Sequence, residues 1–116
     1  MANPNRDRPD QVFLLGPDGI RIELLAGKNL PTVAENHQVH FFTPDVEAVQ
    51  KWYIANFGAV PLTFGRLPAA GLPGVYLIFS ATEAAVAGTK GRALDHIGFE
   101  VKDLESFSKT LEARGI

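Results

Sequence analysis

Hydrophobic and polar positions along the chain predict two helices and several short strands. An apolar run at residues 12–15 is followed by the turn sequence Gly16-Pro17-Asp18-Gly19, and then by alternating apolar and polar residues at 20–25. This pattern predicts a β-hairpin over residues 11–26. The polar residues 1–10 before it are expected to be a disordered tail, and residues 27–36 after it a polar connector.

Residues 37–57 have the pattern of a strand that leads into a helix. Asp45 can cap the helix through its carboxylate, and Gly58 can end it. Four apolar residues recur on one helical face: Val46, Val49, Tyr53 and Phe57. Two further strands are expected at residues 59–64 and 75–79, joined by a loop over the glycine- and proline-rich residues 65–74.

Residues 93–115 repeat this strand–helix pattern after a loose stretch at residues 81–92. Ile97, Phe99 and Asp103 each lie 58 positions after Val39, Phe41 and Asp45. A second helix is therefore expected after Asp103, with Leu104, Phe107 and Leu111 on one face. The alternative is that any amphipathic strand and helix would show the same pattern.

Length and composition limit the class of protein. The 116 residues fit one domain, and the absence of cysteine excludes disulfides and thiolate metal sites. Eleven basic and 13 acidic residues leave a net charge of −2, so we expect neither a nucleic-acid nor a membrane partner. The polar residues 1–10 resemble neither a signal peptide nor a membrane anchor, and we expect a cytoplasmic protein.

Two segments resemble the vicinal oxygen chelate superfamily, which includes glyoxalases, bleomycin-resistance proteins and extradiol dioxygenases. The first is Asp95-His96-Ile97-Gly98-Phe99 with Asp103-Leu104, and the second runs from Gly16 to Leu24. The resemblance implies an α+β fold of paired βαβββ modules, whose curved mixed sheet surrounds a trough. Residues 11–116 would then be one glyoxalase-like domain, with a closing hairpin at 11–26, a first module at 37–80 and the start of a second at 93–116.

The resemblance also implies a divalent metal ion (nickel, zinc, manganese or iron) in that trough. His96 matches the histidine ligand of the family, and Glu23 matches the glutamate ligand. Gln38 takes the place of His96 in the first strand–helix unit and is a third candidate ligand. His40 and Glu100 are candidates for the general base. Strand alternation allows Glu23, Gln38, His40 and His96 to share one face.

The sequence departs from the family pattern in two places. Ile78 stands where the first module would carry its glutamate, and residues 93–116 supply only the strand and helix of a second module. We therefore expect the hairpin to pair beside residues 94–101, either within the chain or across a homodimer. The alternative is that the sequence belongs to a longer multi-module protein.

Three functions remain open at this point. The leading one is a metal-dependent enzyme of the glyoxalase or dioxygenase class that acts on a small oxygenated substrate. The alternatives are a metal-free protein that sequesters small molecules, as bleomycin-resistance proteins do, and an inactive fragment. Ser80 has no neighbouring histidine or acid in the sequence, so no hydrolase triad is predicted.

Overall fold

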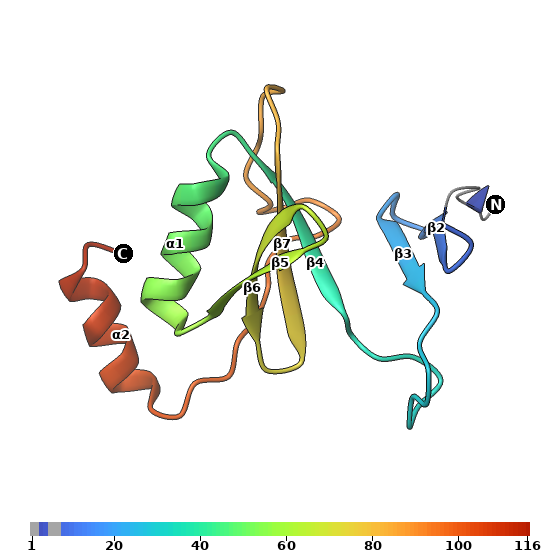
Figure 1. Cartoon of the computed structure of the whole chain (residues 1–116). Helices are drawn as coiled ribbons and strands as arrows, with labels where there is room; N and C mark the ends of the chain where they lie inside the picture. The colour runs from blue at the N-terminus through green and yellow to red at the C-terminus, as the bar shows by residue number, and fades with distance from the viewer. Residues whose placement is uncertain (1–2, 5–7) are drawn as a thin grey trace. The chain divides into compact units, whose positions relative to one another are not determined.

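The computed structural model describes residues 3–4 and 8–116, which fall into two compact units (Figure 1). Unit 1 contains the described residues up to Glu35 together with residues 88–98, and unit 2 contains residues 36–87 and 99–116. The predicted disordered tail at residues 1–10 lies partly outside the described residues, at positions 1–2 and 5–7.

Unit 1 contains an antiparallel sheet with the strand order β1-β2-β3. The strands are β1 (Asn3–Pro4), β2 (Gln11–Leu15) and β3 (Arg21–Leu25). The ladder between β2 and β3 confirms the predicted hairpin. Gly19 has a φ of 76°, and its N–H donates to the carbonyl of Gly16 at 3.0 Å, which closes the turn.

Unit 2 contains a βαβββ module. Its strand order is β4-β7-β6-β5, with β4 parallel to β7 and the other pairs antiparallel. The elements are β4 (Gln38–Thr43), α1 (Val46–Phe57), β5 (Val60–Phe64), β6 (Leu67–Leu72) and β7 (Val75–Ala81). This arrangement confirms the α+β class and supplies one βαβββ module.

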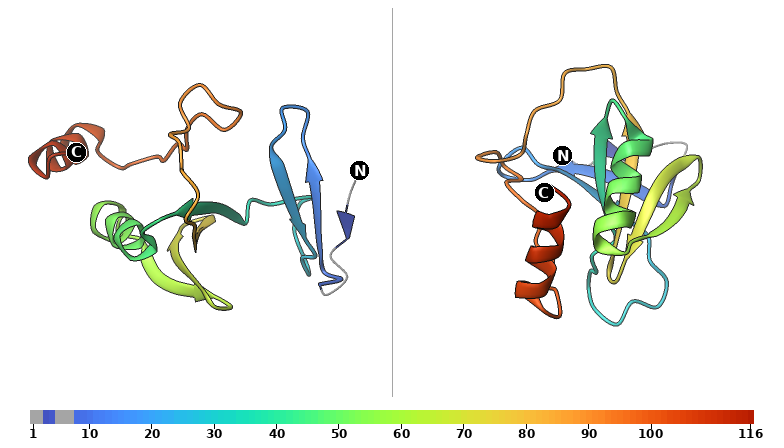
Figure 2. Two further views of the ribbon diagram at one scale, coloured as in Figure 1. Left: turned by 90° about the horizontal axis from the view of Figure 1, so that it is seen from above. Right: turned by 90° about the vertical axis from the view of Figure 1, so that its left-hand side faces the viewer.

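The core of unit 2 lies between α1 and one face of the sheet (Figures 1 and 2). Leu77 and Phe79 on β7 are 0% exposed, and Val39 and Phe41 on β4 pack against the same cluster. Asp45 begins α1 by accepting from Ala48 N at 2.9 Å. Gly58 ends it in the left-handed region, as the sequence predicts.

Strand β6 corrects the expectation of a loop over residues 65–74. Its residues Ala69 and Ala70 are fully buried, and Gln50 on α1 donates to the Ala69 carbonyl at 2.7 Å. Pro68 has no N–H to donate, but the ladder to β7 begins only at Ala69. Small residues therefore form the inner strand β6, because α1 lies close to the sheet at this point.

Of the second predicted strand–helix unit, the helix forms and the strand does not. Helix α2 (Leu104–Ala113) forms after Asp103, which accepts from Ser106 N at 3.1 Å. Residues 94–101 were expected to be a strand and are not one, and the sheets of the described chain do not include them. A strand needs a ladder partner to satisfy its backbone groups, and none of the described strands pairs with this segment.

Helix α2 is held at the end of α1 rather than over a sheet of its own (Figure 1). Arg114 donates to the Ala55 carbonyl at 2.6 Å and to Asn56 Oδ1 at 3.0 Å. Phe57 at the end of α1 contacts Phe99 and Phe107, with ring centroids at 5.0 and 5.7 Å. These contacts join α2, and Phe99 just before it, to the C-terminal end of α1.

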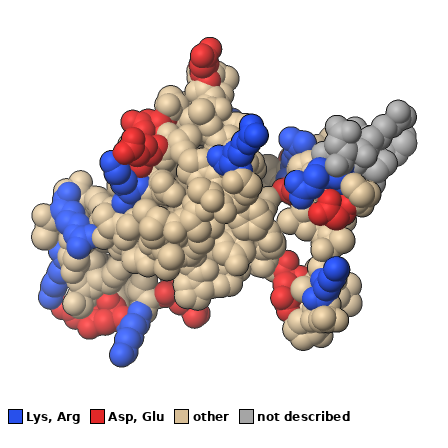
Figure 3. Space-filling model, in the orientation of Figure 1, with Lys and Arg blue, Asp and Glu red and all other residues tan. Residues whose placement is uncertain are grey.

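The helices and surface charges are consistent with the composition. No helix of the described chain is long and apolar enough to span a membrane. Basic and acidic side chains are interspersed over the face shown in Figure 3.

Candidate functional site

The face of the unit 2 sheet opposite α1 carries polar and aromatic side chains. Strand alternation puts six residues of β4 and β7 on it: Gln38, His40, Phe42, Tyr76, Ile78 and Ser80. We call this the polar–aromatic face. The register brings them into three rows across the parallel ladder, because Gln38, His40 and Phe42 lie opposite Tyr76, Ile78 and Ser80. Phe42 is 59% exposed, whereas its helix-side neighbour Phe41 packs in the core.

An aromatic cluster lies at one end of this face. His37 contacts Phe64 and Tyr76 edge-on, with ring centroids at 5.3 and 5.4 Å, and Phe64 and Tyr76 are 5.3 Å apart. His37 Nδ1 lies 2.9 Å from Gln38 Oε1, an acceptor, so Nδ1 donates in this contact. The cluster therefore combines ring surface with an oriented imidazole.

Gly71 makes room for this cluster. A Cβ at that position would lie 2.8 Å from Leu62 Cδ2 and 3.8 Å from Tyr76 Cδ1. A side chain there would push on the neighbours of the Tyr76 ring. The absence of a side chain at Gly71 thus helps to set the shape of the polar–aromatic face.

A histidine–serine pair lies further along the same face. His40 Nε2 and Ser80 Oγ are 2.9 Å apart, and the His40 ring stacks on Phe42 at 5.2 Å with planes 9° apart. His40 lies opposite Ile78, so Ser80 is its diagonal neighbour on the ladder. An imidazole in contact with a hydroxyl can act as a proton acceptor for it. Sequence reasoning missed this pair because residues 40 positions apart meet only through the register of β4 and β7.

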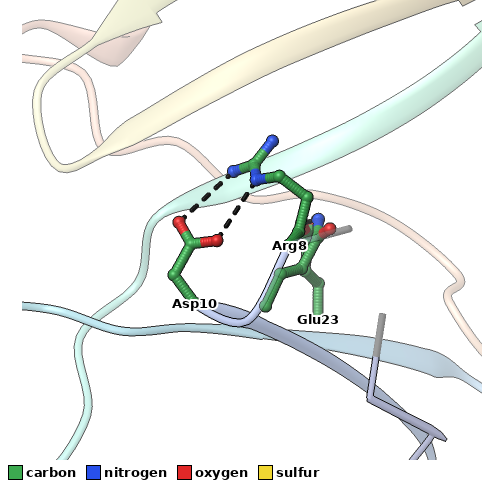
Figure 4. A network of polar contacts seen from close by, with 4 residues as sticks. Arg8, Asp10 and Glu23 are labelled. Atoms are coloured by element: carbon green, nitrogen blue, oxygen red, sulfur yellow. Dashed lines mark hydrogen bonds and ion pairs between the residues drawn. The ribbon is translucent and has the colours of Figure 1, made fainter. Parts of the chain in front are cut away.

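Glu23 in unit 1 lies in a polar cluster on the hairpin. Gln11 Nε2 donates to its carboxylate, and Phe13 lies opposite it on the ladder. Arg21 sits over the Phe13 ring at 3.8 Å. Figure 4 shows Glu23 beside the Arg8–Asp10 ion pair, whose hydrogen bond lowers the pKa of Asp10. Glu23 is thus an anchored carboxylate rather than a fully solvated one.

His96 lies in the loop of unit 1 and is oriented by its neighbour Asp95. His96 Nδ1 is 2.9 Å from Asp95 Oδ1, and the other oxygen of Asp95 accepts from the backbone N–H of Gly91. The Gly91 N–H, followed by His96, lowers the pKa of Asp95. Thr89 also donates to the Asp95 carbonyl at 2.6 Å. The carboxylate engages Nδ1, and the His96 side chain remains 82% exposed.

The predicted site residues are divided between the two units. Glu23 and His96 belong to unit 1, whereas Gln38, His40 and Glu100 belong to unit 2. Glu100 is exposed and lies outside the strands. Across the described residues, no group of three histidine or acidic side chains is arranged to hold a metal ion. The predicted ligand set therefore stays a prediction.

Comparisons with known proteins support the fold. No family model and no curated protein matches the sequence. A solved structure named "Oxidase ChaP-H2" is similar over 72% of this chain, with a TM-score of 0.58 and 16% identity. The match spans 65% of that oxidase, less than two thirds of its length.

A second solved structure, from the mobile metagenome of V. Pseudocholerae and named VPC_CASS1, is also similar. It matches 75% of this chain and 70% of its own, with a TM-score of 0.57 and 14% identity. At these identities the likeness concerns the fold. The chain is therefore an α+β protein with a βαβββ-type module, and its likeness to the vicinal oxygen chelate superfamily remains an interpretation of the sequence.

Proposed function

We propose that the polar–aromatic face of unit 2 binds a small molecule with a planar ring and a hydroxyl or carbonyl group. The observation that carries this proposal is the combination, on one sheet face, of the His37–Phe64–Tyr76 cluster and the His40–Ser80 pair. Aromatic side chains stack on planar ligands, while the imidazole and hydroxyl orient a polar group. This is the metal-free binding function, and it needs residues of unit 2 alone.

His40 gives the same face a group that can take a proton from a bound ligand. A ligand hydroxyl that takes the place of Ser80 Oγ beside Nε2 would be in position to lose its proton to the imidazole. Ser80 would then keep the imidazole oriented between turnovers. One structural neighbour is named an oxidase, which is compatible with enzyme chemistry on this fold.

Binding can be tested with 1-naphthol as the planar probe and naphthalene as the probe without a hydroxyl. Nitrogen-15 NMR spectra should show shifts on β4 and β7. Tyr76→Ala should weaken binding roughly fivefold, since an aromatic contact contributes about 1 kcal/mol. Trp52→Ala, which removes a partly exposed ring on α1, is the matched control and should leave the affinity unchanged.

The polar part of the site has its own test. His40→Gln should weaken the binding of 1-naphthol and leave the binding of naphthalene unchanged, because only the former has a hydroxyl to orient. Shifts confined to α1 or to the hairpin, with β4 and β7 unaffected, would contradict the proposed location.

A second candidate function is metal-dependent catalysis through His96 and Glu23, with Gln38 as the third ligand. The Asp95–His96 contact favours it, because a carboxylate on Nδ1 directs the other ring nitrogen toward a ligand, as in many metal sites. A bound divalent cation would polarise a substrate carbonyl or enediol. His96 and Glu23 both belong to unit 1, so the remaining ligands of the metal ion would have to come from outside unit 1.

Calorimetric titration with zinc, manganese, nickel and iron(II) tests this second function. His96→Ala should abolish binding, whereas His37→Ala, which removes a histidine outside the predicted ligand set, should not. Equal affinity in the parent and in His96→Ala, or no binding of any of the four ions, would rule against it.

A further inference from the structure

The four strands of the unit 2 sheet carry no acidic or basic side chain. Strands β4, β5, β6 and β7 contain no aspartate, glutamate, lysine or arginine, although these residues make up 21% of the sequence. The sheet of unit 1 differs, since β3 contains Arg21 and Glu23. Charged residues close to the unit 2 strands in sequence, such as Asp45, Arg66 and Glu83, are exposed and lie outside the strands.

Burial does not explain this lack of charge, because several positions of the polar–aromatic face are open to solvent. Phe42 is 59% exposed and Tyr76 is 38% exposed. Val60 on β5 shares this face, since Val60, Gly71 and Tyr76 lie in one row across the sheet, and it is 62% exposed. Solvent-exposed positions are where charged residues are usually found. Here they are rings, methyl groups and neutral polar groups instead.

The centre of the face is apolar. Ala69 lies opposite Ile78 on the ladder, and Ile78 lies opposite His40. Ala69 is 0% exposed and Ile78 is 3% exposed, so both side chains form a closed floor between the two polar ends of the face. An ion held over this floor would lose part of its hydration without meeting an opposite charge, which is costly.

The polar groups around this floor are suited to an uncharged partner. They are the His40–Ser80 pair and the His37–Gln38 pair, each with 2.9 Å between its polar atoms. Imidazole, hydroxyl and carboxamide groups form hydrogen bonds in their neutral forms. In addition, a neutral ligand hydroxyl carries the proton that His40 can take, whereas an ionised oxygen has already lost it.

The aromatic cluster does not form a cage for a cation either. His37 contacts the rings of Phe64 and Tyr76 edge-on, and these two rings also contact one another. A ligand cation needs the faces of such rings directed toward it. The imidazole of His37 already occupies the place between them.

We propose that the polar–aromatic face selects uncharged planar ligands and rejects anions and cations of the same shape. The inference rests on the proposed binding function and adds the class of ligand to it. That class comprises neutral phenols, aromatic ketones and quinones, whose oxygen can form a hydrogen bond with the imidazole or the serine. It excludes carboxylates, phosphorylated compounds and amines.

Three probes with one ring system test this selectivity. They are 1-naphthol, which is neutral, 1-naphthoate, an anion, and 1-naphthylmethylammonium, a cation. Nitrogen-15 NMR titration of the whole chain at neutral pH follows the resonances of β4 and β7. 1-Naphthol should bind at least about tenfold more tightly than either ion. Tighter or equal binding of either ion at β4 and β7 would overturn the proposal.

A charge placed on the face gives a second test. Val60→Lys adds a cation about 10 Å from the Tyr76 backbone, two strand spacings away, and Gly71 between them has no side chain in the path. The variant should bind 1-naphthoate about threefold to tenfold more tightly and 1-naphthol as before. The gain should shrink as salt is added.

Thr63→Lys is the matched control. Thr63 is exposed on the same strand, but alternation puts it on the opposite face of the sheet. It should leave the affinity for all three probes unchanged. An equal gain for 1-naphthoate in both lysine variants would overturn the proposal, because the attraction would then not depend on the face.

The outcomes separate this inference from the function on which it rests. If all three probes shift β4 and β7 with equal affinity, the face binds planar rings but does not select by charge, and only the inference fails. If no probe shifts β4 and β7, the proposed binding function fails and the inference fails with it.

Discussion

The hairpins β2–β3 and β6–β7 share an apolar pattern, yet they differ in burial. Leu77 and Phe79 are fully buried beneath α1, whereas Ile22 and Leu24, their counterparts at the same spacing from the turn glycine, are 38% and 50% exposed. The difference does not come from the strands themselves, since both form antiparallel ladders. It comes from the covering helix, which follows β4 in unit 2 and which the described part of unit 1 lacks. An alternating strand thus specifies a face to be covered, and the topology decides whether a helix reaches it.

The largest expected effect comes from truncating the two equivalent positions. Phe79→Ala should destabilise the protein by about 3–5 kcal/mol, because it opens a cavity beneath α1. Leu24→Ala should cost less than about 1 kcal/mol at low protein concentration and more as concentration rises, because the expected homodimer would bury Leu24. Urea unfolding at several concentrations measures both. If the destabilisation caused by Leu24→Ala does not change with protein concentration, no partner chain buries Leu24.

The helix caps give the next effect. Asp45→Ala should lower the free energy of unfolding by about 1 kcal/mol, because the carboxylate accepts the Ala48 N–H at the start of α1. Asp103→Ala removes the same kind of bond from α2 but should affect mainly the amide exchange of that helix. Equal losses of global stability would mean that α2 is as much part of the core as α1.

Alanine substitutions at two glycines compare how closely packed their surroundings are. Gly71→Ala should cost about 1 kcal/mol and shift the Tyr76 resonances, because its Cβ meets Leu62 at 2.8 Å. Gly98→Ala should be nearly neutral in the monomer, where nothing lies within 4 Å of the added Cβ. Thermal unfolding and NMR of both variants check this difference.

The smallest effect concerns pH. The pKa of Asp95 lies below its usual 3.8, owing to the Gly91 N–H and then to His96. Because the folded pKa is lowered, the contribution of Asp95 to loop order is present above that value and is lost as the pH falls through the folded pKa. The protection of the Gly91 amide from hydrogen exchange, relative to its intrinsic exchange rate at each pH, should therefore fall as the pH drops below 3.8. Asp95→Ala should show the low protection at every pH.

Local signals in the sequence predicted much of this structure. Asp45, Gly58 and Asp103 mark the helix ends because a cap needs only its nearest neighbours. Strand β6 was missed because Pro68 and Gly71 have the local pattern of a loop, and only the approach of α1 explains the burial of Ala69 and Ala70. Residues 94–101 were expected to be a strand on local pattern alone, although a strand also needs a partner.

The candidate site was less accessible to sequence reasoning. Alternation predicted that His40 would lie on the face opposite α1, but the His40–Ser80 contact depends on the register of two parallel strands. The His37–Phe64–Tyr76 cluster joins a residue before β4 to the ends of β5 and β7. The spacing of residues along the sequence does not reveal these side-chain contacts. They form only because the connection through α1 brings β4 beside β7.

One measurement tests the expected pairing of the hairpin with residues 94–101 most directly. In a sample mixed from isotope-labelled and unlabelled chains, filtered NOE spectra detect only contacts between copies. The expected homodimer predicts intermolecular NOEs from Ile22 and Leu24 to Ile97 and Phe99, together with a strand conformation at residues 96–101. NOEs between these residues within one chain, or their complete absence in a monomer, would contradict it.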